Sequence, residues 1–127
     1  MEDNDEEGKL KRKEEEEEEN QEIWCWGAGT DGQLGTGKLQ DEHFPQLLRL
    51  PALSSAGPTS FSLLSCGGAH VLALTAGGKV LSWGRGESGQ LGHGDTENSP
   101  NAKLVMLLES HFITHVSAGW NHSGFVS

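Results

Sequence analysis

A glycine-rich segment occurs twice in this chain, and the repetition limits what the chain can fold into. Residues 26–37 are W-G-A-G-T-D-G-Q-L-G-T-G and residues 83–94 are W-G-R-G-E-S-G-Q-L-G-H-G, so eight of twelve positions are identical. The two copies begin 57 residues apart, at Trp26 and Trp83. A repeat of this length is one supersecondary unit that buries its apolar face by stacking on further copies. We therefore expect a repeat architecture.

A second motif repeats with a different offset. The sequence C-G-G-A-H at residues 66–70 returns as A-G-W-N-H at residues 118–122, which are 52 positions further on. The second unit is therefore five residues shorter between its two motifs. The extra length of the first unit is assigned to Leu53–Ser60, a stretch rich in Ser, Gly and Pro, because a surface loop tolerates a change of length at little cost.

The charge is concentrated at the N-terminus. Residues 1–22 hold twelve acidic and four basic side chains, whereas the remaining residues hold seven and five. With almost no apolar side chains, this segment cannot offset its chain entropy by burial, so residues 1–22 are predicted to be a disordered acidic tail.

The two cysteines indicate the redox environment. Cys25 and Cys66 lie in apolar runs and are predicted to be buried free thiols, which favours a reducing compartment.

Eight short runs after residue 22 have the composition of β-strands and are bounded by Gly and Pro. The runs span residues 23–26, 46–50, 61–66, 71–75, 80–83, 104–108, 113–118 and 123–126. Ala76-Gly77-Gly78 is typical of a hairpin turn. We predict an all-β partial β-propeller of about two four-stranded antiparallel blades. Residues 23–83 would form a lone strand plus a complete meander from Pro45 to Trp83, and residues 84–127 an incomplete blade.

These motifs resemble the regulator of chromosome condensation repeat family. The resemblance rests on the W-G-x-G-x-x-G-Q-L-G-x-G segment, on C-G-x-x-H, and on the A-L-T-x-x-G-x-V-x-x-W-G pattern that ends at Gly84; it covers residues 23–127. It implies a seven-bladed β-propeller. This chain has only two repeats, so we expect it to be a fragment or to need further repeats or another chain to close the ring.

Eight residues at equivalent repeat positions are assigned structural roles. Trp26 and Trp83 are expected to pack between blades and Trp24 to join the core. His70 and His122 are expected to hydrogen-bond a turn inside each blade, because neighbouring blades hold equivalent positions too far apart to share a metal ion. The full set is Trp26, Gly27, Gly35, His70, Trp83, Gly84, Gly92 and His122.

Both glycine-rich segments also fit the G-x-G-x-x-G pattern of a dinucleotide-binding turn. Such a turn needs a helix N-terminus directly after it, inside a βαβ unit. The residues that follow, Gln-Leu-Gly-x-Gly, indicate another tight turn. A dinucleotide-binding enzyme is therefore a remote alternative, and we predict no cofactor, no metal and no catalytic residue.

The resemblance implies a protein-binding module. Members of the family commonly act on small GTPases, and the founding member exchanges nucleotide on Ran. Such exchange is catalysis by binding, which needs no acid or base. The candidate partner contacts are the loop residues Asp31, Gln33, Arg85, Glu87, Gln90, His93 and Asp95, with Trp120 as a surface aromatic.

Trp120 supports one alternative function. The sequence G-W-N-H-S at residues 119–123 is similar to the G-W-R-H-S/T motif of the family's plant ultraviolet-B photoreceptor, in which tryptophans flanked by arginines absorb light and hold a dimer. Here Asn121 replaces the arginine, and the motif occurs once. A light-responsive protein that uses Trp120 is thus the second functional hypothesis.

The tail suggests the class of partner. Glu14–Glu19 would favour a basic protein, such as a chromatin protein, and would repel nucleic acid. Residues 23–127 carry no basic stripe, and no apolar run is long enough to cross a membrane, so neither DNA nor a bilayer is expected as a partner. Lys9–Lys13 resembles a nuclear-localisation cluster, and the predicted location is the nucleus or cytoplasm.

Overall fold

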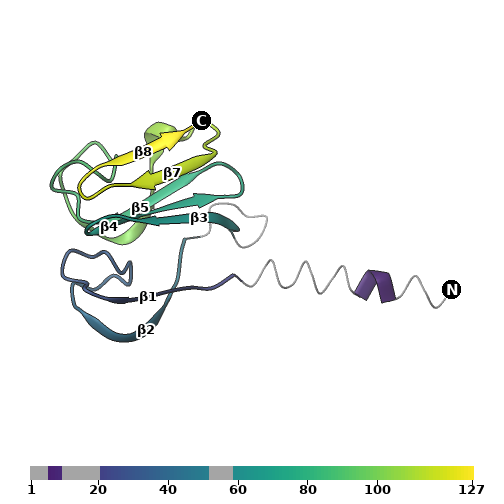
Figure 1. Ribbon diagram of the computed structural model, residues 1–127, viewed down its shortest axis with the longest axis horizontal. Coiled ribbons are helices and arrows are strands. Elements are labelled where there is room, and N and C mark those ends of the chain that lie inside the picture. Colours follow the sequence, from purple (N-terminus) through teal and green to yellow (C-terminus); the bar gives the residue numbers. More distant parts are fainter. Residues whose placement is uncertain (1–5, 10–20, 52–58) are drawn as a thin grey trace.

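The computed structural model describes residues 6–9, 21–51 and 59–127, and it is built almost entirely from β-strands (Figure 1). Eight strands and one short 3-10 helix follow one another along the described chain. They are β1 (Ile23–Gly27), β2 (Glu42–Leu48), β3 (Phe61–Cys66), β4 (His70–Thr75), β5 (Val80–Gly84), β6 (Ser99–Leu104), η1 (Met106–Leu108), β7 (His115–Ala118) and β8 (Ser123–Val126).

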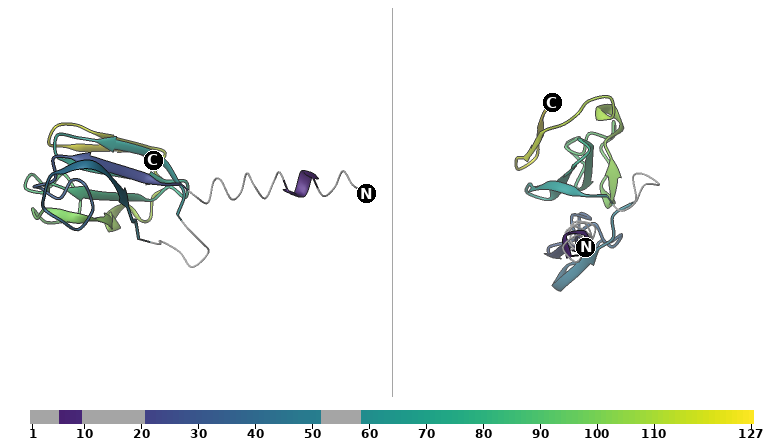
Figure 2. Two further views of the ribbon diagram at one scale, coloured as in Figure 1. Left: turned by 90° about the horizontal axis from the view of Figure 1, so that it is seen from below. Right: turned by 90° about the vertical axis from the view of Figure 1, so that its right-hand side faces the viewer.

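The strands form three antiparallel sheets, which lie one beside the next (Figure 2). The middle sheet has four strands in the order β3-β4-β5-β6, so it is a simple meander. It is flanked by the two-stranded sheet β1-β2 on one side and by the two-stranded sheet β7-β8 on the other. The described chain therefore contains one complete four-stranded blade between two half-blades.

Each of the two gaps between sheets is filled by its own apolar cluster. Between β1-β2 and the middle sheet, the buried side chains are Leu48, Val71, Ala73, Leu81 and Trp83. Between the middle sheet and β7-β8, they are Leu72, Leu74, Val80, Val105, Ile113 and Val116. Successive residues of β4 thus contribute to opposite clusters, because side chains alternate across a strand. The central strands β4 and β5 are buried on both faces.

The prediction of an all-β partial propeller is confirmed, but the predicted blade boundaries are wrong. The complete meander runs from Phe61 to Leu104, whereas the sequence placed it from Pro45 to Trp83. The strand after Pro45 pairs with β1, with Ile23 opposite Leu48, and not with β3. Strand composition cannot reveal this difference, because each run is compatible with a partner on either side.

Two strands contain a proline, and both begin earlier than the runs predicted from the sequence. Pro45 lies within β2 and Pro100 within β6, and both strands are the last of their sheets. An edge strand tolerates a residue without an N–H, so these prolines do not mark strand boundaries. The predicted strand 104–108 is also wrong: β6 ends at Leu104 and η1 follows.

The hairpin predicted at Ala76–Gly78 is confirmed. The amide of Gly78 donates to the carbonyl of Thr75 over 3.0 Å, and Gly78 has a φ of 78°.

In the N-terminal segment, residues 6–9 form one helical turn. The disorder predicted for residues 1–5 and 10–20 lies outside the described residues, and so does most of the predicted loop Leu53–Ser60. Within the described part, no helix has the length and apolarity that a membrane crossing requires.

Candidate protein-interaction surface

The two glycine-rich loops and two short turns lie at the same end of the sheets, on the left in Figure 1. We call this surface the loop face; it comprises residues 28–41 and 85–98 and the turns 67–69 and 119–122. Two backbone hydrogen bonds join segments of this face: Gly68 N–H to Trp120 O (3.2 Å), between two sheets, and Arg85 N–H to Ala69 O (2.9 Å), within the middle sheet. A third, Gly37 N–H to Pro100 O (2.9 Å), joins the first loop to β6.

The two loops are built by the same side-chain brace. The amide of Gly29 donates to Asp41 Oδ1 over 2.9 Å, and the amide of Gly86 donates to Asn98 Oδ1 over 2.9 Å. Asp41 and Asn98 are 57 residues apart, the offset of the repeat itself. Sequence reasoning missed both residues, although the repeated offset of an Asp/Asn pair was a usable signal.

The two glutamines of the loops brace them as well. Gln33 Oε1 accepts from the amide of Asp31 over 2.9 Å, and Gln90 Oε1 accepts from the amide of Ser88 over 2.9 Å. Gln90 is only 5% exposed, so its predicted role as an exposed partner contact is wrong. Gln33 and Asp31 are half-buried.

The loops lack the geometry of a phosphate-binding turn. The amides of Gly29 and Asp31, which such a turn would offer to a phosphate, are bonded to side chains of the loop. Residues 30–38 continue as turns and bends, with no helix after β1. A dinucleotide-binding site at these loops would need the N-terminus of a helix, and no helix follows β1.

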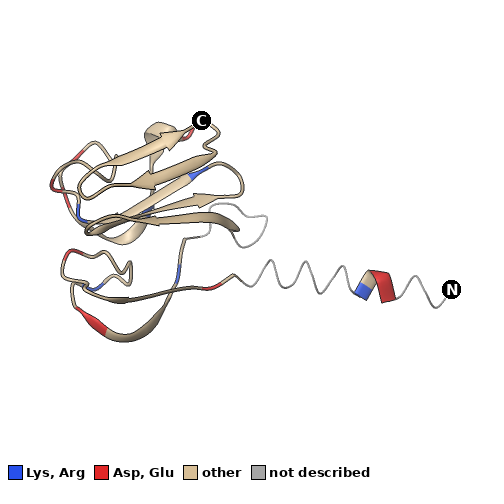
Figure 3. Cartoon of the chain, in the orientation of Figure 1, with Lys and Arg blue, Asp and Glu red and all other residues tan. Residues whose placement is uncertain are grey.

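Charged side chains on the loop face are mainly acidic (Figure 3). Arg85 forms an ion pair of 2.9 Å with Glu87, and Glu87 and Asp95 are exposed to solvent. The loop carboxylates are Asp31, Asp41, Glu87, Asp95 and Glu97, and the loop cations are Lys38 and Arg85. A surface with this balance attracts a positively charged partner.

Two histidines on or beside this face are held in the fold. Nε2 of His70, whose ring is buried, lies 2.9 Å from Ser123 Oγ on β8, and this hydroxyl donates to the carbonyl of Gln90 over 2.7 Å. His70 therefore joins two neighbouring sheets, whereas the sequence predicted a bond to a turn of its own blade. Ser123 was missed, since a lone serine in a strand gives no signal.

His93 is likewise bonded within its blade. Its Nε2 lies 3.0 Å from Ser82 Oγ, so this candidate partner contact is half-buried and already occupied. Burial lowers the pKa of both His70 and His93 below the ordinary value, because it disfavours the charged imidazolium. His122, the repeat equivalent of His70, is exposed.

The two repeat-equivalent tryptophans differ completely in burial. Trp83 is 0% exposed, and its indole N–H donates to the carbonyl of Gln33 over 3.0 Å. A Cβ at Gly35 would lie 2.8 Å from Trp83 Nε1, so the preceding loop packs directly on the ring. Trp26 is 60% exposed and Trp24 is 48% exposed, so their predicted packing between blades and in the core is wrong for the described residues.

Trp120 lies on the loop face with 76% of its surface exposed. A Cβ at Gly68 would lie 2.7 Å from its ring, so the indole rests on the turn of the middle sheet. Gly68 is the repeat equivalent of Trp120, and its lack of a side chain leaves room for the ring. Trp120 is thus a surface aromatic, as predicted, at a junction of two sheets.

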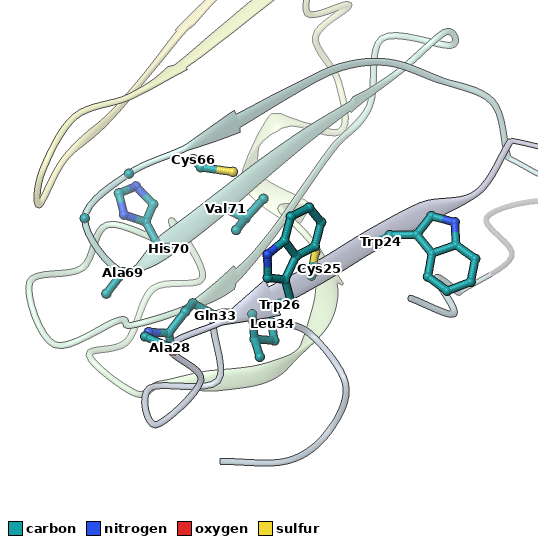
Figure 4. Close-up of a pocket in the computed structure, with 12 residues that line it drawn as sticks. Trp24, Cys25, Trp26, Ala28, Gln33, Leu34, Cys66, Ala69, His70 and Val71 are labelled. Carbon is teal, nitrogen blue, oxygen red and sulfur yellow. The ribbon is translucent and has the colours of Figure 1, made fainter. Parts of the chain in front are cut away.

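A cavity of about 340 Å³ lies between β1 and the turn that joins β3 to β4 (Figure 4). Trp24 and Trp26 line it from β1, and His70 and Val71 line it from β4.

The two cysteines beside this cavity, Cys25 and Cys66, are free thiols. Cys66 is exposed, contrary to the prediction, and Cys25 is half-buried. Desolvation of the sulfur atoms, including that of Cys66 although the residue as a whole is exposed, raises the pKa of both thiols. The described residues contain no cluster of three metal-binding side chains.

The loop face therefore brings together Asp31, Arg85, Glu87, Asp95 and Trp120 from the predicted contact set, while Gln33, Gln90 and His93 support the loops from within. Among the predicted structural residues, Gly27 and Gly84 end β1 and β5, and Gly92 lies beside Val105. The resulting surface offers carboxylates and one large aromatic ring, on loops that are braced by internal hydrogen bonds. Such a surface suits binding to another macromolecule better than bond-making chemistry.

Comparisons with known proteins agree with this geometry. Residues 20–74 and 77–126 match the model of the regulator of chromosome condensation (RCC1) repeat. The ultraviolet-B receptor UVR8 of Arabidopsis thaliana is 39% identical over 106 residues, covering 84% of this chain and 23% of the receptor. The E3 ubiquitin-protein ligase HERC2 of Homo sapiens is 36% identical over 99 residues, covering 76% of this chain and 2% of the ligase.

The fold is also similar to that of a solved structure. Prp20p from Saccharomyces cerevisiae matches with a TM-score of 0.66 and 28% identity, covering 83% of this chain and 26% of Prp20p. The chain thus spans about a quarter or less of the length of these proteins.

Proposed function

This chain belongs to the regulator of chromosome condensation (RCC1) repeat family, and we propose that it is a protein-interaction module whose loop face binds a basic protein. The observation that carries the proposal is the charge of that face. Five loop carboxylates stand against two cations, and one of those cations, Arg85, is paired with Glu87. Trp120 adds an exposed aromatic ring of the kind that anchors protein interfaces.

The acidic tail supports the same class of partner. Residues 1–22 carry twelve acidic and four basic side chains, and a tail of this charge would raise the rate of encounter with a cationic protein. Prp20p has been studied for its binding to Gsp1p and histones, and histones are basic. We therefore take a histone as the probe. A histone partner would place at least part of the protein in the nucleus.

Binding of purified core histones to the chain tests this function. Replacing Glu87 and Asp95 with Lys reverses two exposed charges of the loop face, and we expect it to weaken binding about tenfold or more at moderate salt. Glu109→Lys is the control for each single variant, Glu87→Lys or Asp95→Lys, because it makes the same change of two charge units beside η1, near Lys79 on the β4-β5 turn at the opposite end of the sheets. Equal binding by the loop-face variants and the control would contradict the proposal.

Guanine nucleotide exchange on a small GTPase is a second candidate. Family membership supports it, since a rigid face could stabilise the nucleotide-free GTPase without an acid or base. The aligned part of this chain covers only about a quarter or less of each matched relative, so we expect a weak activity here. Release of a fluorescent nucleotide from a panel of small GTPases measures this exchange activity. No acceleration of the release at a saturating concentration of the chain would exclude the activity.

A light response through Trp120 is the remaining candidate. The 39% identity with the ultraviolet-B receptor and the exposure of Trp120 support it, whereas Asn121 stands where the receptor's motif has Arg. Ultraviolet-B irradiation should then change the oligomeric state, and Trp120→Phe should abolish that change. An oligomeric state that is unaffected by irradiation would exclude this function.

A further inference from the structure

The two outer sheets are different halves of one blade. With the repeat offset of 57 residues, β1 and β2 correspond to β5 and β6, the last two strands of the middle sheet. With the offset of 52 residues, β7 and β8 correspond to β3 and β4, its first two strands. One outer sheet thus supplies what the other lacks.

Each half-blade ends in an edge strand with no described neighbour. β1 pairs only with β2, and β8 pairs only with β7, within the described ranges. Neither Ile23–Gly27 nor Ser123–Val126 contains a charged residue or a proline. Charges and prolines are the usual means by which an edge strand is protected from pairing with another chain. Both edges are therefore open to a strand of matching geometry.

We propose that a second copy of this chain occupies these edges, so that β8 of one copy pairs antiparallel with β1 of another and completes a four-stranded blade. The β4-β5 ladder gives the register, with Val71 opposite Trp83 and Leu72 opposite Ser82. Transferred through the two offsets, Ser123 of one copy lies opposite Trp26 of the other. Gly124 then lies opposite Cys25.

The burial pattern of the strands supports this pairing. All residues of β4 and β5 are buried, whereas their equivalents β8 and β1 alternate between half-buried and exposed residues. In the completed blade, Trp26 takes the place that Trp83 has in the middle sheet. Its indole N–H then faces the carbonyl of Gln90 of the second copy, the equivalent of the Gln33 carbonyl that Trp83 binds.

One chain cannot make this pairing with itself. β1 and β8 lie on opposite sides of the middle sheet, so its own strands keep the two edges apart (Figure 1). The interface joins different surfaces of the two copies, head to tail. The cavity beside Trp24 and Trp26 lies along the free edge of β1, where the incoming hairpin would enter.

Sedimentation velocity of the 127-residue chain over a range of concentrations tests the association. We expect multiples of the 13.6 kDa monomer, and we expect Trp26→Lys to raise the dissociation constant about 30-fold or more, the effect of losing a central aromatic. Phe44→Lys is the matched control, because Phe44 is also exposed and its equivalent in the complete blade, Asn101, is exposed as well. A chain that stays monomeric at about 0.1 mM, or equal losses in both variants, would overturn the proposal.

Disulfide trapping tests the register independently of affinity. In a Cys66→Ser background, Gly124→Cys places a thiol opposite Cys25 of the second copy, on the same face and at a separation that a disulfide can span. Mild oxidation should then give a covalent species linked through positions 25 and 124. Ser123→Cys is the control, since its side chain points to the opposite face. Equal cross-linking of the two variants, or none in Gly124→Cys, would contradict the pairing.

Discussion

Trp83 and Trp26 occupy the same position of the repeat, yet one is fully buried and the other is mostly exposed. The difference lies in what precedes each residue. Trp83 is covered by the loop of the sheet before it, through the Gln33 carbonyl and the close approach of Gly35. No described residue provides such a loop for Trp26. The burial of a repeat residue is therefore decided by its neighbouring repeat and not by its own motif.

The same contrast separates the middle sheet from the outer sheets. His70 is buried and bonded to Ser123 of the next sheet, while His122 is exposed. Leu72, Ala73 and Leu81 have no exposed surface, because the middle sheet has a sheet on each side. We infer that most of the stability of the chain resides in the middle sheet and its two apolar clusters.

The largest expected effect comes from truncating the two tryptophans. Trp83→Ala removes a fully buried ring between two sheets and should lower the free energy of unfolding by about 3–5 kcal/mol. Trp26→Ala should cost less than about 1 kcal/mol, because the ring is already in water. Urea denaturation followed by circular dichroism measures both. Equal losses would remove the distinction between the two positions.

A pair of equivalent glycines isolates the contact between sheets. Gly32 and Gly89 have φ values of 82° and 74°, so a substitution by Ala introduces similar backbone strain at both. At Gly32 the new Cβ would also lie 2.7 Å from Pro100 Cα, whereas at Gly89 nothing lies within 4 Å. Gly32→Ala should therefore be less stable than Gly89→Ala by about 1–3 kcal/mol. Identical unfolding midpoints would show that the loop does not pack on β6.

Acid should weaken the junction of the middle sheet with β8. Burial lowers the pKa of His70 in the folded state, so below about pH 6.5 the unfolded chain binds the proton first and stability falls. The loss is at most about 1.4 kcal/mol per pH unit. His70→Gln should flatten the dependence of unfolding free energy on pH between 7 and 5. His43→Gln, an exposed histidine on β2, is the control, and an equal change in both would argue against the role of burial.

The smallest effect is expected for the ion pair of Arg85 and Glu87. The first loop has Ala28 and Thr30 at the equivalent positions, so the pair exists in one repeat only. Both side chains are substantially exposed, and such pairs contribute about 0.2–1 kcal/mol. Arg85→Ala should change the urea midpoint slightly at low salt and not at all at 1 M salt. A larger or salt-independent loss would indicate a packing role for the arginine.

The repeat itself was sufficient to predict most of the strands, the hairpin and the class of fold, whereas the strand predicted at 104–108 was wrong. It did not predict that β2 pairs with β1, because the composition of a strand does not show on which side its partner lies. The start of β2 was misplaced because Pro45 was taken as a boundary, although an edge strand accommodates it. The repeat also could not assign burial: Gln90 and Gln33 have the same sequence context, but only the folded chain shows that their amides brace the loops. Ser123 gives no sequence signal, since its role depends on His70 of another sheet.

Hydrogen exchange at low micromolar concentration, where association is minimal, tests the central claim most directly. If the sheets are wedges that depend on their neighbours, amides of β4 and β5 should exchange only with global unfolding, and those of β1 and β8 should exchange far faster. Uniform protection across Ile23–Gly27, His70–Gly84 and Ser123–Val126 would contradict this account, because it would show that the outer strands need no neighbouring sheet.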